Sequence, residues 1–135
     1  MTRFVVDAGA ALELAARRAV VPDVHELLAP TLLRSQVLTL MHEAVHRGEL
    51  PAAEARERLA RVGRMRIRLL GDAVLRQTAW KVADQLGWAS TLDAEYVALT
   101  QLQADAFVTL DDHLARAVAG VVRTASLETV LDPLV

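Results

Sequence analysis

The sequence predicts an α/β domain in which helices cover both faces of a central parallel sheet of four to five strands. Short apolar segments typical of strands alternate along the chain with segments of helical spacing. Two strand-like segments, Phe4–Val6 and Ala106–Leu110, end directly before Asp7 and Asp111. Strands separated by helices pair in parallel through crossover connections, so we expect three layers, α/β/α.

The composition is that of one folded domain over residues 1–135. Hydrophobic residues make up 53% and charged residues 24% of the chain, a mixture typical of a packed protein. Cysteine is absent, which excludes disulfides and thiolate metal sites. Asp7 and Glu13 interrupt the first apolar stretch, and no apolar run reaches the roughly 18 residues of a membrane span. We therefore expect a cytoplasmic protein without a membrane segment.

The first half of the chain predicts one strand and three helices. The strand is the apolar run before Asp7, and an Ala/Leu-rich helix follows it. Pro22 and Pro30 interrupt the next stretch, and Gly48 and Pro51 separate two further helices. The predicted elements are a strand over residues 4–6 and helices over 10–18, 31–46 and 52–63.

In the second half the hydrophobic period changes first. Met65, Ile67 and Leu69 alternate with arginines in residues 64–70, which predicts a strand with one basic face. Gly87 ends the next predicted helix, and Ser126 is expected to cap a final helical turn. The remaining predicted elements are helices over 72–86, 91–103 and 111–119 and strands over 106–110 and 121–124.

The positions of Asp7 and Asp111 predict a site at one edge of the sheet. Ligands of open α/β sheets bind outside the carboxyl ends of the strands. Aspartates gathered there repel one another, and hard divalent cations such as Mg²⁺ or Mn²⁺ offset that repulsion. The usual chemistry of such sites is metal-assisted phosphodiester hydrolysis. The alternative is that each aspartate only caps a helix.

Four segments add a resemblance to a known family: VVDAGAALEL, PTLLRSQVLTLM, TLDAEYVALTQ and AFVTLDDHLARA, in this order. They resemble the conserved segments of PIN-domain proteins, most closely the VapC-type toxins of bacterial toxin–antitoxin pairs. By this resemblance Asp7, Asp93 and Asp111 correspond to metal ligands, and Thr109 to a hydroxyl residue of the site. It implies a PIN-like fold and an endoribonuclease that uses Mg²⁺ or Mn²⁺. It also implies a homodimer held inactive by a small antitoxin.

The sequence departs from this family at Gln36, where the family usually has glutamate, and at Thr39, where it has asparagine. A glutamine carbonyl can coordinate a hard cation but brings no charge. Glu43 lies about 10 Å further along the predicted helix, too far to replace it. Asp112 is either a further carboxylate or a helix cap. Gln36 is therefore a neutral ligand of a working nuclease, or it marks an attenuated protein that serves as an RNA- or antitoxin-binding module.

A second motif competes with this interpretation. His42, Glu43 and His46 fit the H-E-x-x-H pattern of zinc peptidases on a predicted helix. Such a site needs a third protein ligand, and neither His25 nor His113 lies in a recognisable ligand segment. We expect two partly exposed histidines that bind at most adventitious metal.

The net charge of −2 means that RNA would have to be attracted by local basic patches and bound cations. Arg34 and Arg116 flank the predicted site and are the preferred phosphate contacts, whereas the arginines of residues 56–68 are expected to form a solvated surface. Trp80 and Trp88 are expected to pack in the core or against a sister subunit. Four leucines are expected to form partner-facing surface or core: Leu12, Leu32, Leu33 and Leu40.

Overall fold

The computed structural model describes residues 1–134 and contains one parallel sheet of five strands. The order across the sheet is β3-β2-β1-β4-β5, and all four neighbouring pairs are parallel. The predicted α/β class, with a parallel sheet between helices, is therefore confirmed. The strands are β1 (Thr2–Val6), β2 (His25–Pro30), β3 (Ile67–Leu70), β4 (Ala106–Val108) and β5 (Thr124–Ala125).

The carboxyl-terminal parts of the inner strands are apolar because helices cover them on both faces. Phe4–Val6 of β1 and all of β4 are buried, so neither strand shows the alternation of a one-sided sheet. The edge strand β3 keeps Arg68 exposed between partly buried Ile67 and Leu69, as its alternating pattern predicts.

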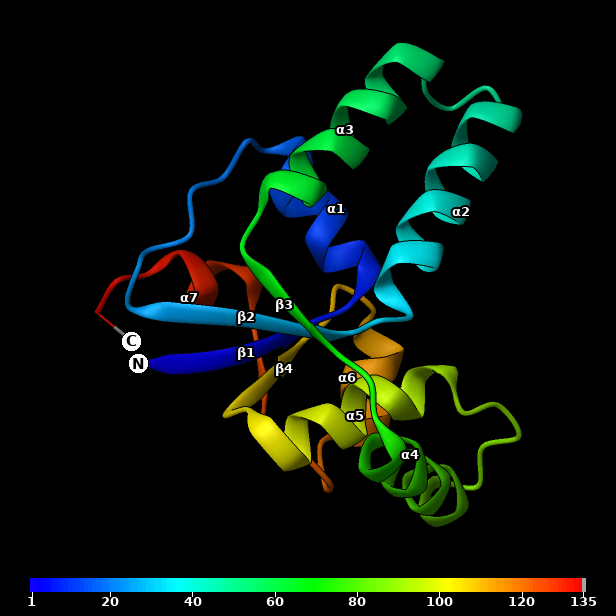
Figure 1. Ribbon diagram of the computed structural model, residues 1–135, viewed down its shortest axis with the longest axis vertical. Helices are drawn as coiled ribbons and strands as arrows, with labels where there is room; N and C mark the ends of the chain where they lie inside the picture. The colour runs from blue at the N-terminus through cyan, green and yellow to red at the C-terminus, as the bar shows by residue number, and fades with distance from the viewer. Residues whose placement is uncertain (135) are drawn as a thin grey trace.

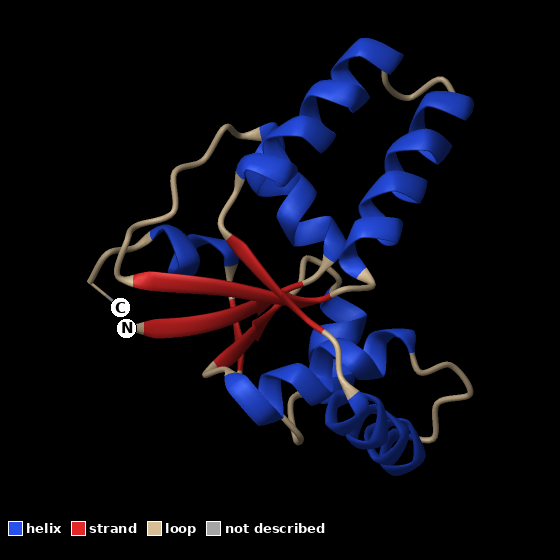
Figure 2. Ribbon diagram, viewed as in Figure 1, coloured by secondary structure: helices blue, strands red, loops and turns tan. Residues whose placement is uncertain are grey.

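Helices lie on both sides of the sheet (Figure 1). α1, α2 and α3 pack together on one side, and α4 and α5 pack together on the other. Figure 2 shows α2 and α3 extending away from the sheet as an antiparallel pair. The helices are α1 (Ala8–Ala16), α2 (Leu33–His46), α3 (Ala52–Arg64), α4 (Ala73–Leu86), α5 (Leu92–Gln103), α6 (Asp112–Val118) and α7 (Leu127–Leu131).

Most helix ends lie where the sequence predicts them because capping residues mark them. Asp72 and Ser126 accept hydrogen bonds from backbone N–H groups in the first turns of α4 and α7. Gly48 and Gly87 follow α2 and α4 with φ of +75° and +70°, the left-handed conformation that ends many helices. Arg18 has the same conformation after α1, with φ of +53°.

The sequence prediction misses one strand and displaces another. β2 was not predicted, because its apolar centre, Leu27–Ala29, is short and ends at Pro30. The last strand was predicted over 121–124 but lies at Thr124–Ala125, because the backbone of 118–122 turns back on Val118 instead. β4 ends at Val108, two residues earlier than predicted.

The structure also tests several packing predictions that left two alternatives open. Trp80 is 67% exposed, so it is not a core residue, whereas Trp88 is partly buried against the core. Leu12 and Leu33 are core residues, and Leu32 packs against the core, so within this chain they offer little surface to a partner. Only Leu40 of that group is exposed.

The order of the strands creates a crevice at the carboxyl edge of β1 and β4. The chain builds β2 and β3 on one side of β1 and then crosses to build β4 and β5 on the other. The connections after β1 and β4 therefore leave the sheet in opposite directions, which is the topological switch point where ligands bind in such folds. Asp7 follows β1, and the segment Thr109–Asp111 follows β4.

No helix within residues 1–134 is both long and apolar enough to cross a membrane.

Candidate functional site

Asp7 and Asp111 each occupy the position where a strand ends and a helix begins. Asp7 caps α1, its Oδ1 accepting a hydrogen bond from the Ala10 N–H at 2.9 Å. Asp111 caps α6 in the same way, accepting from the Leu114 N–H at 3.1 Å. The capping alternative is thus correct for both residues. It does not compete with a shared site, because both caps lie at the carboxyl edge of neighbouring strands.

Asp93 comes to the same edge from a different element. It lies in the first turn of α5, one residue after its start at Leu92, and its side chain is exposed. All three aspartates are therefore at helix amino-termini, where the helix dipole favours a negative charge. Convergent helix ends partly offset the repulsion among the carboxylates.

The carboxylates are close enough to influence one another. Burial raises the pKa of Asp7, and the negative charges of Asp93 and Asp111 raise it further, against the lowering effect of its hydrogen bonds from Thr109 and Ala10. Although much of the Asp93 side chain is exposed, partial desolvation also raises the pKa of Asp93, with a further contribution from Asp111. The structure thus brings the three predicted aspartates into one electrostatic cluster.

Thr109 connects two members of this cluster. Its hydroxyl hydrogen-bonds the Asp7 carboxylate and accepts a hydrogen bond from the Asp111 N–H at 3.2 Å. A hydroxyl group can donate and accept at once, which a carboxylate or an ammonium group cannot do. Thr109 therefore fixes the Asp7 carboxylate relative to the start of α6.

Gln36 reaches the cluster through a residue that the sequence analysis did not single out. The Tyr96 hydroxyl donates a hydrogen bond of 2.5 Å to Gln36 Oε1. Burial raises the pKa of Tyr96, and the charges of Asp7 and Asp93 add to the effect, so this phenol stays protonated and able to donate. Tyr96 lies three residues after Asp93 on α5, and this spacing on one helix face was the signal available in the sequence.

A small hollow adjoins Asp93 at the start of α5. Its volume is about 330 Å³, and Trp88, Ser90 and Asp93 are among the residues that line it. Trp88 both packs against the core and borders this hollow. Trp88 therefore packs against the core and also borders the hollow that Asp93 lines.

The other residues singled out in the sequence are exposed or make contacts within their own helix. His42 and His46 are exposed on α2, as expected. Glu43 is engaged by Thr39 and Arg47 on the same helix. Asp112 does not cap α6, contrary to one of the two expectations, because Asp111 does; it is an exposed residue of the first turn.

The donor set suits an oxygen-seeking dication more than any other metal. Carboxylate, hydroxyl and amide oxygens are the ligands that Mg²⁺ and Mn²⁺ take, and carboxylates that raise one another's pKa lack a compensating positive charge. Within residues 1–134, no group of three or more histidine, aspartate or glutamate side chains is arranged so that it could hold a metal ion.

Comparison with known proteins identifies the fold but no close relative. No family model matches the chain, and no curated protein matches it. PAE2754 from Pyrobaculum aerophilum is a similar solved structure, with 23% identity over 96% of this chain and 93% of that chain and a TM-score of 0.73. A chain of VapBC-1 from nontypeable Haemophilus influenzae aligns with 12% identity over 94% of this chain and 99% of that one, with a TM-score of 0.61.

These similarities extend over nearly the whole of each chain, and at such identities they establish the fold alone. The protein has a PIN-like fold, with a five-stranded parallel sheet flanked by helices. The fold class implied by the four conserved-looking segments is thereby confirmed.

Proposed function

We propose that this protein is a Mg²⁺- or Mn²⁺-dependent endoribonuclease that acts as the toxin of a type II toxin–antitoxin pair. The observation that carries the proposal is the cluster of Asp7, Asp93 and Asp111, joined by Thr109, at the switch point of a PIN-like sheet. The resemblance of its segments to VapC-type toxins and the fold shared with a chain of VapBC-1 support it.

In this proposal each residue has a defined task. Asp7, Asp93 and Asp111 hold the cation, and Thr109 keeps the Asp7 carboxylate in place. When bound, the cation lowers the pKa of a water molecule and neutralises charge on the phosphate. Gln36, held by Tyr96 through Oε1, presents its amide N–H groups as donors to a phosphate or a water molecule.

Purified protein tests the cleavage activity directly. The Asp7→Asn variant retains a capping side chain but loses a negative charge. We expect it to cleave single-stranded RNA in Mn²⁺ about a hundredfold or more slowly than wild type, because several kcal/mol of charge stabilisation depend on the metal. Asp84→Asn, an exposed change on α4, is the matched control and should retain activity. Equal rates for wild type and Asp7→Asn would refute the nuclease proposal.

Expression in a bacterial host tests the biological role. Induced wild type should arrest growth, and Asp7→Asn should relieve the arrest at the same protein level. Arrest by both proteins would show that toxicity does not come from cleavage at this site. The same proposal includes an antitoxin partner, a homodimer and action on cytoplasmic RNA. Co-purification with the product of a neighbouring small gene checks the antitoxin partner. The mass measured by light scattering checks the homodimer.

One observation favours a second function. Gln36 brings no charge, and its carbonyl oxygen already accepts the Tyr96 hydrogen bond, which leaves three carboxylates for the cation. The alternative is a PIN-fold protein with attenuated catalysis that binds RNA or an antitoxin. Gln36→Glu separates the two: tighter Mn²⁺ binding and faster cleavage in the variant support attenuation, and unchanged values for both contradict it.

A further inference from the structure

A large cavity lies at the opposite end of the sheet from the aspartates. Its volume is about 890 Å³, within the range of small-molecule pockets. Its lining comes from the end of α1 and the loop after it, the first residues of β2, the last turns of α3 and the two residues before β3. These are the amino ends of strands, so the amino-edge cavity is separate from the candidate metal site.

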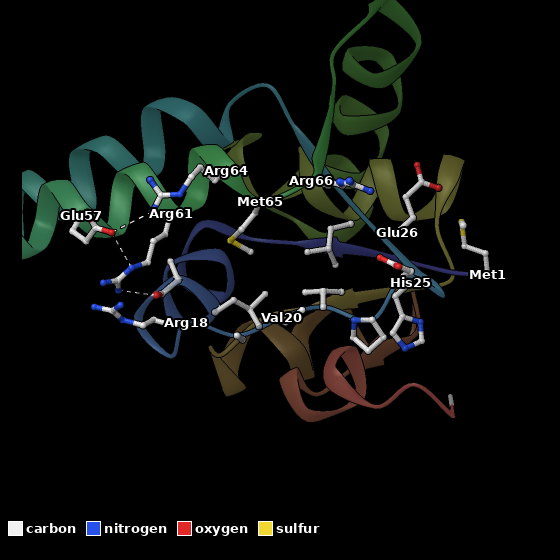
Figure 3. Close-up of a pocket in the computed structure, with 17 residues that line it drawn as sticks. Met1, Arg18, Val20, His25, Glu26, Glu57, Arg61, Arg64, Met65 and Arg66 are labelled. Carbon is white, nitrogen blue, oxygen red and sulfur yellow. Dashed lines mark hydrogen bonds and ion pairs between the residues drawn. The ribbon is translucent and has the colours of Figure 1, made fainter.

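The cavity has an apolar middle and a basic end (Figure 3). Met65 and Val20 lie between its two ends, with Leu14, Val21 and Leu27 also in the lining. Arg18, Arg61 and Arg64 gather at one end in Figure 3, and His25 and Glu26 lie at the other. Arg66 lies nearer Glu26, so a ligand that fills the cavity would meet three guanidinium groups at one end and a single one toward the other.

The basic end is built into the fold and is not neutralised by its own carboxylates. The Arg61 side chain is only 10% exposed and donates a hydrogen bond to the Ala15 carbonyl at 3.1 Å. Arg61 and Arg64 both pair with the same oxygen of Glu57, at 3.3 and 3.2 Å. Within residues 1–134 Arg18 pairs with no carboxylate, and Arg61 pairs with Glu54 at 3.9 Å as well as with Glu57. Glu54 also pairs with Arg58, so the guanidinium groups at this end still outnumber the carboxylates. An anionic group would complete the balance.

The left-handed backbone conformation of Arg18 is a second feature that points to a site at this end of the cavity. After α1 the Ala19 N–H donates to the Leu14 carbonyl and the Arg18 N–H to the Ala15 carbonyl, which is a Schellman motif with Arg18 at the left-handed position. The same pair of bonds closes α2 and α4, where that position is glycine, as its conformation favours. Of these three helix ends, the end of α1 borders the cavity, and it is the one with arginine instead of glycine in the left-handed position. A strained residue at a site is a reason to look for a function there.

His25 has an unpartnered ring nitrogen at the far end. The residue is 7% exposed, and its Nε2 donates a hydrogen bond to the Asp132 carbonyl at 2.6 Å. Nδ1 is buried and has no hydrogen-bond partner among the described residues. Glu26, beside it, already pairs with Arg3 and Arg68. Arg66 also lies toward this end, next to Glu26 in Figure 3, so the positive charge of the lining is greatest at the Arg18 end.

From these features we infer that the amino-edge cavity binds an amphipathic organic anion, with its carboxylate or phosphate against Arg18 and Arg64 and its apolar body along Val20 and Met65. The inference does not rest on the proposed nuclease function, because none of these residues belongs to the aspartate cluster. An Asp7→Asn variant that has lost cleavage should bind the anion as wild type does, so either proposal can fail alone.

Titrations followed by amide NMR shifts test the ligand class. Octanoate and octyl phosphate, below their micelle concentrations, should each give saturable shifts that map to the cavity, and the tighter of the two identifies the preferred head group. Octanol, which lacks the charge, and inorganic phosphate, which lacks the apolar body, should not saturate at the same concentrations. Binding of octanol as tight as octanoate, or no saturation by either amphiphile, would overturn the inference.

Variants at the basic end test the geometry. Arg18→Gly removes the guanidinium group and places the favoured residue in the left-handed position, so it should weaken octyl phosphate binding on the order of tenfold while the melting temperature stays equal or rises. Val20→Asp, at a side chain 87% exposed, should also weaken binding without loss of packing. Arg76→Gln, an exposed change on α4, is the control for lost positive charge. Wild-type affinity in both cavity variants would overturn the inference.

Discussion

The Asp7 carboxylate caps α1 through its bond from the Ala10 N–H and also belongs to the aspartate cluster. Burial, with Asp93 and Asp111, raises its pKa above 3.8, so in this range the folded state binds more protons than the unfolded state. The free energy of unfolding contributed by Asp7 therefore falls as the pH rises from 3.8 through the raised value.

Asp7→Asn should remove this pH-dependent loss of stability, because asparagine does not ionise. The helix cap should be kept, because asparagine and aspartate cap helices about equally well. In EDTA the variant should melt above wild type at neutral pH, and the difference should shrink as the pH falls through the raised pKa toward 3.8. Calorimetry across that range checks it. A constant difference at all pH values would mean that the Asp7 pKa is not raised by folding.

The bond between Tyr96 and Gln36 predicts a coupled pair. Tyr96→Phe removes a partly buried neutral hydrogen bond and should lower the free energy of unfolding by about 1 kcal/mol. In a double-mutant cycle with Gln36→Ala, urea denaturation should give a coupling energy of about 1 kcal/mol. Strictly additive effects would show that the two side chains do not interact in solution.

At the scale of the elements, two glycines differ in the space available for a side chain. A Cβ at Gly71, after β3, would lie 2.8 Å from Thr31 Oγ1 and 3.2 Å from its Cγ2, because the chain segments following β2 and β3 approach closely there. A Cβ at Gly63, inside α3, would meet nothing within 4 Å.

Gly71→Ala should therefore destabilise the protein by about 1 kcal/mol, since Thr31 must turn or shift to make room. Gly63→Ala should stabilise it by about 0.5–1 kcal/mol, because alanine is the better helix former. Chemical denaturation of both variants beside wild type measures the two signs. A stabilising Gly71→Ala would mean that the contact with Thr31 is looser than the structure has it.

The sequence predicts an element well when the residues that define its ends are neighbours in the chain. Asp72, Gly48, Gly87 and Ser126 mark helix ends through bonds to their own neighbours, so their positions are readable from the chain. β2 is defined by β1 and β3 on either side of it, and its own residues, His25–Pro30, carry too short an apolar run to reveal it.

The residues of the candidate site also differ in whether the sequence pattern alone reveals them. Asp7 and Asp111 follow apolar strands and are visible as strand-end aspartates, whereas Asp93 came only through the resemblance to PIN-domain segments. The Tyr96–Gln36 contact spans 60 positions and depends on how α2 and α5 meet beside the sheet. No spacing within either helix contains that information.

For the whole molecule, the cluster predicts a link between the cation and stability. Mn²⁺ at a hundredfold excess over its Kd should raise the free energy of unfolding of wild type by about 2.7 kcal/mol, because it binds the folded state alone. Asp7→Asn should gain much less at the same concentration. Thermal melts with and without Mn²⁺ check this, and equal gains would place the bound cation elsewhere.

The central place of β1 also has a consequence for the newly made chain. β1 leaves the ribosome before its partner β4, at Ala106–Val108, which comes about a hundred positions later in the chain. Such distant pairing forms slowly and only when both strands exist. Asp7 thus has no Thr109 or Asp111 beside it until the segment that carries β4 has been made. If the proposed nuclease is correct, the polypeptide cannot cut RNA, including its own message, before that segment has been synthesised and has paired with β1.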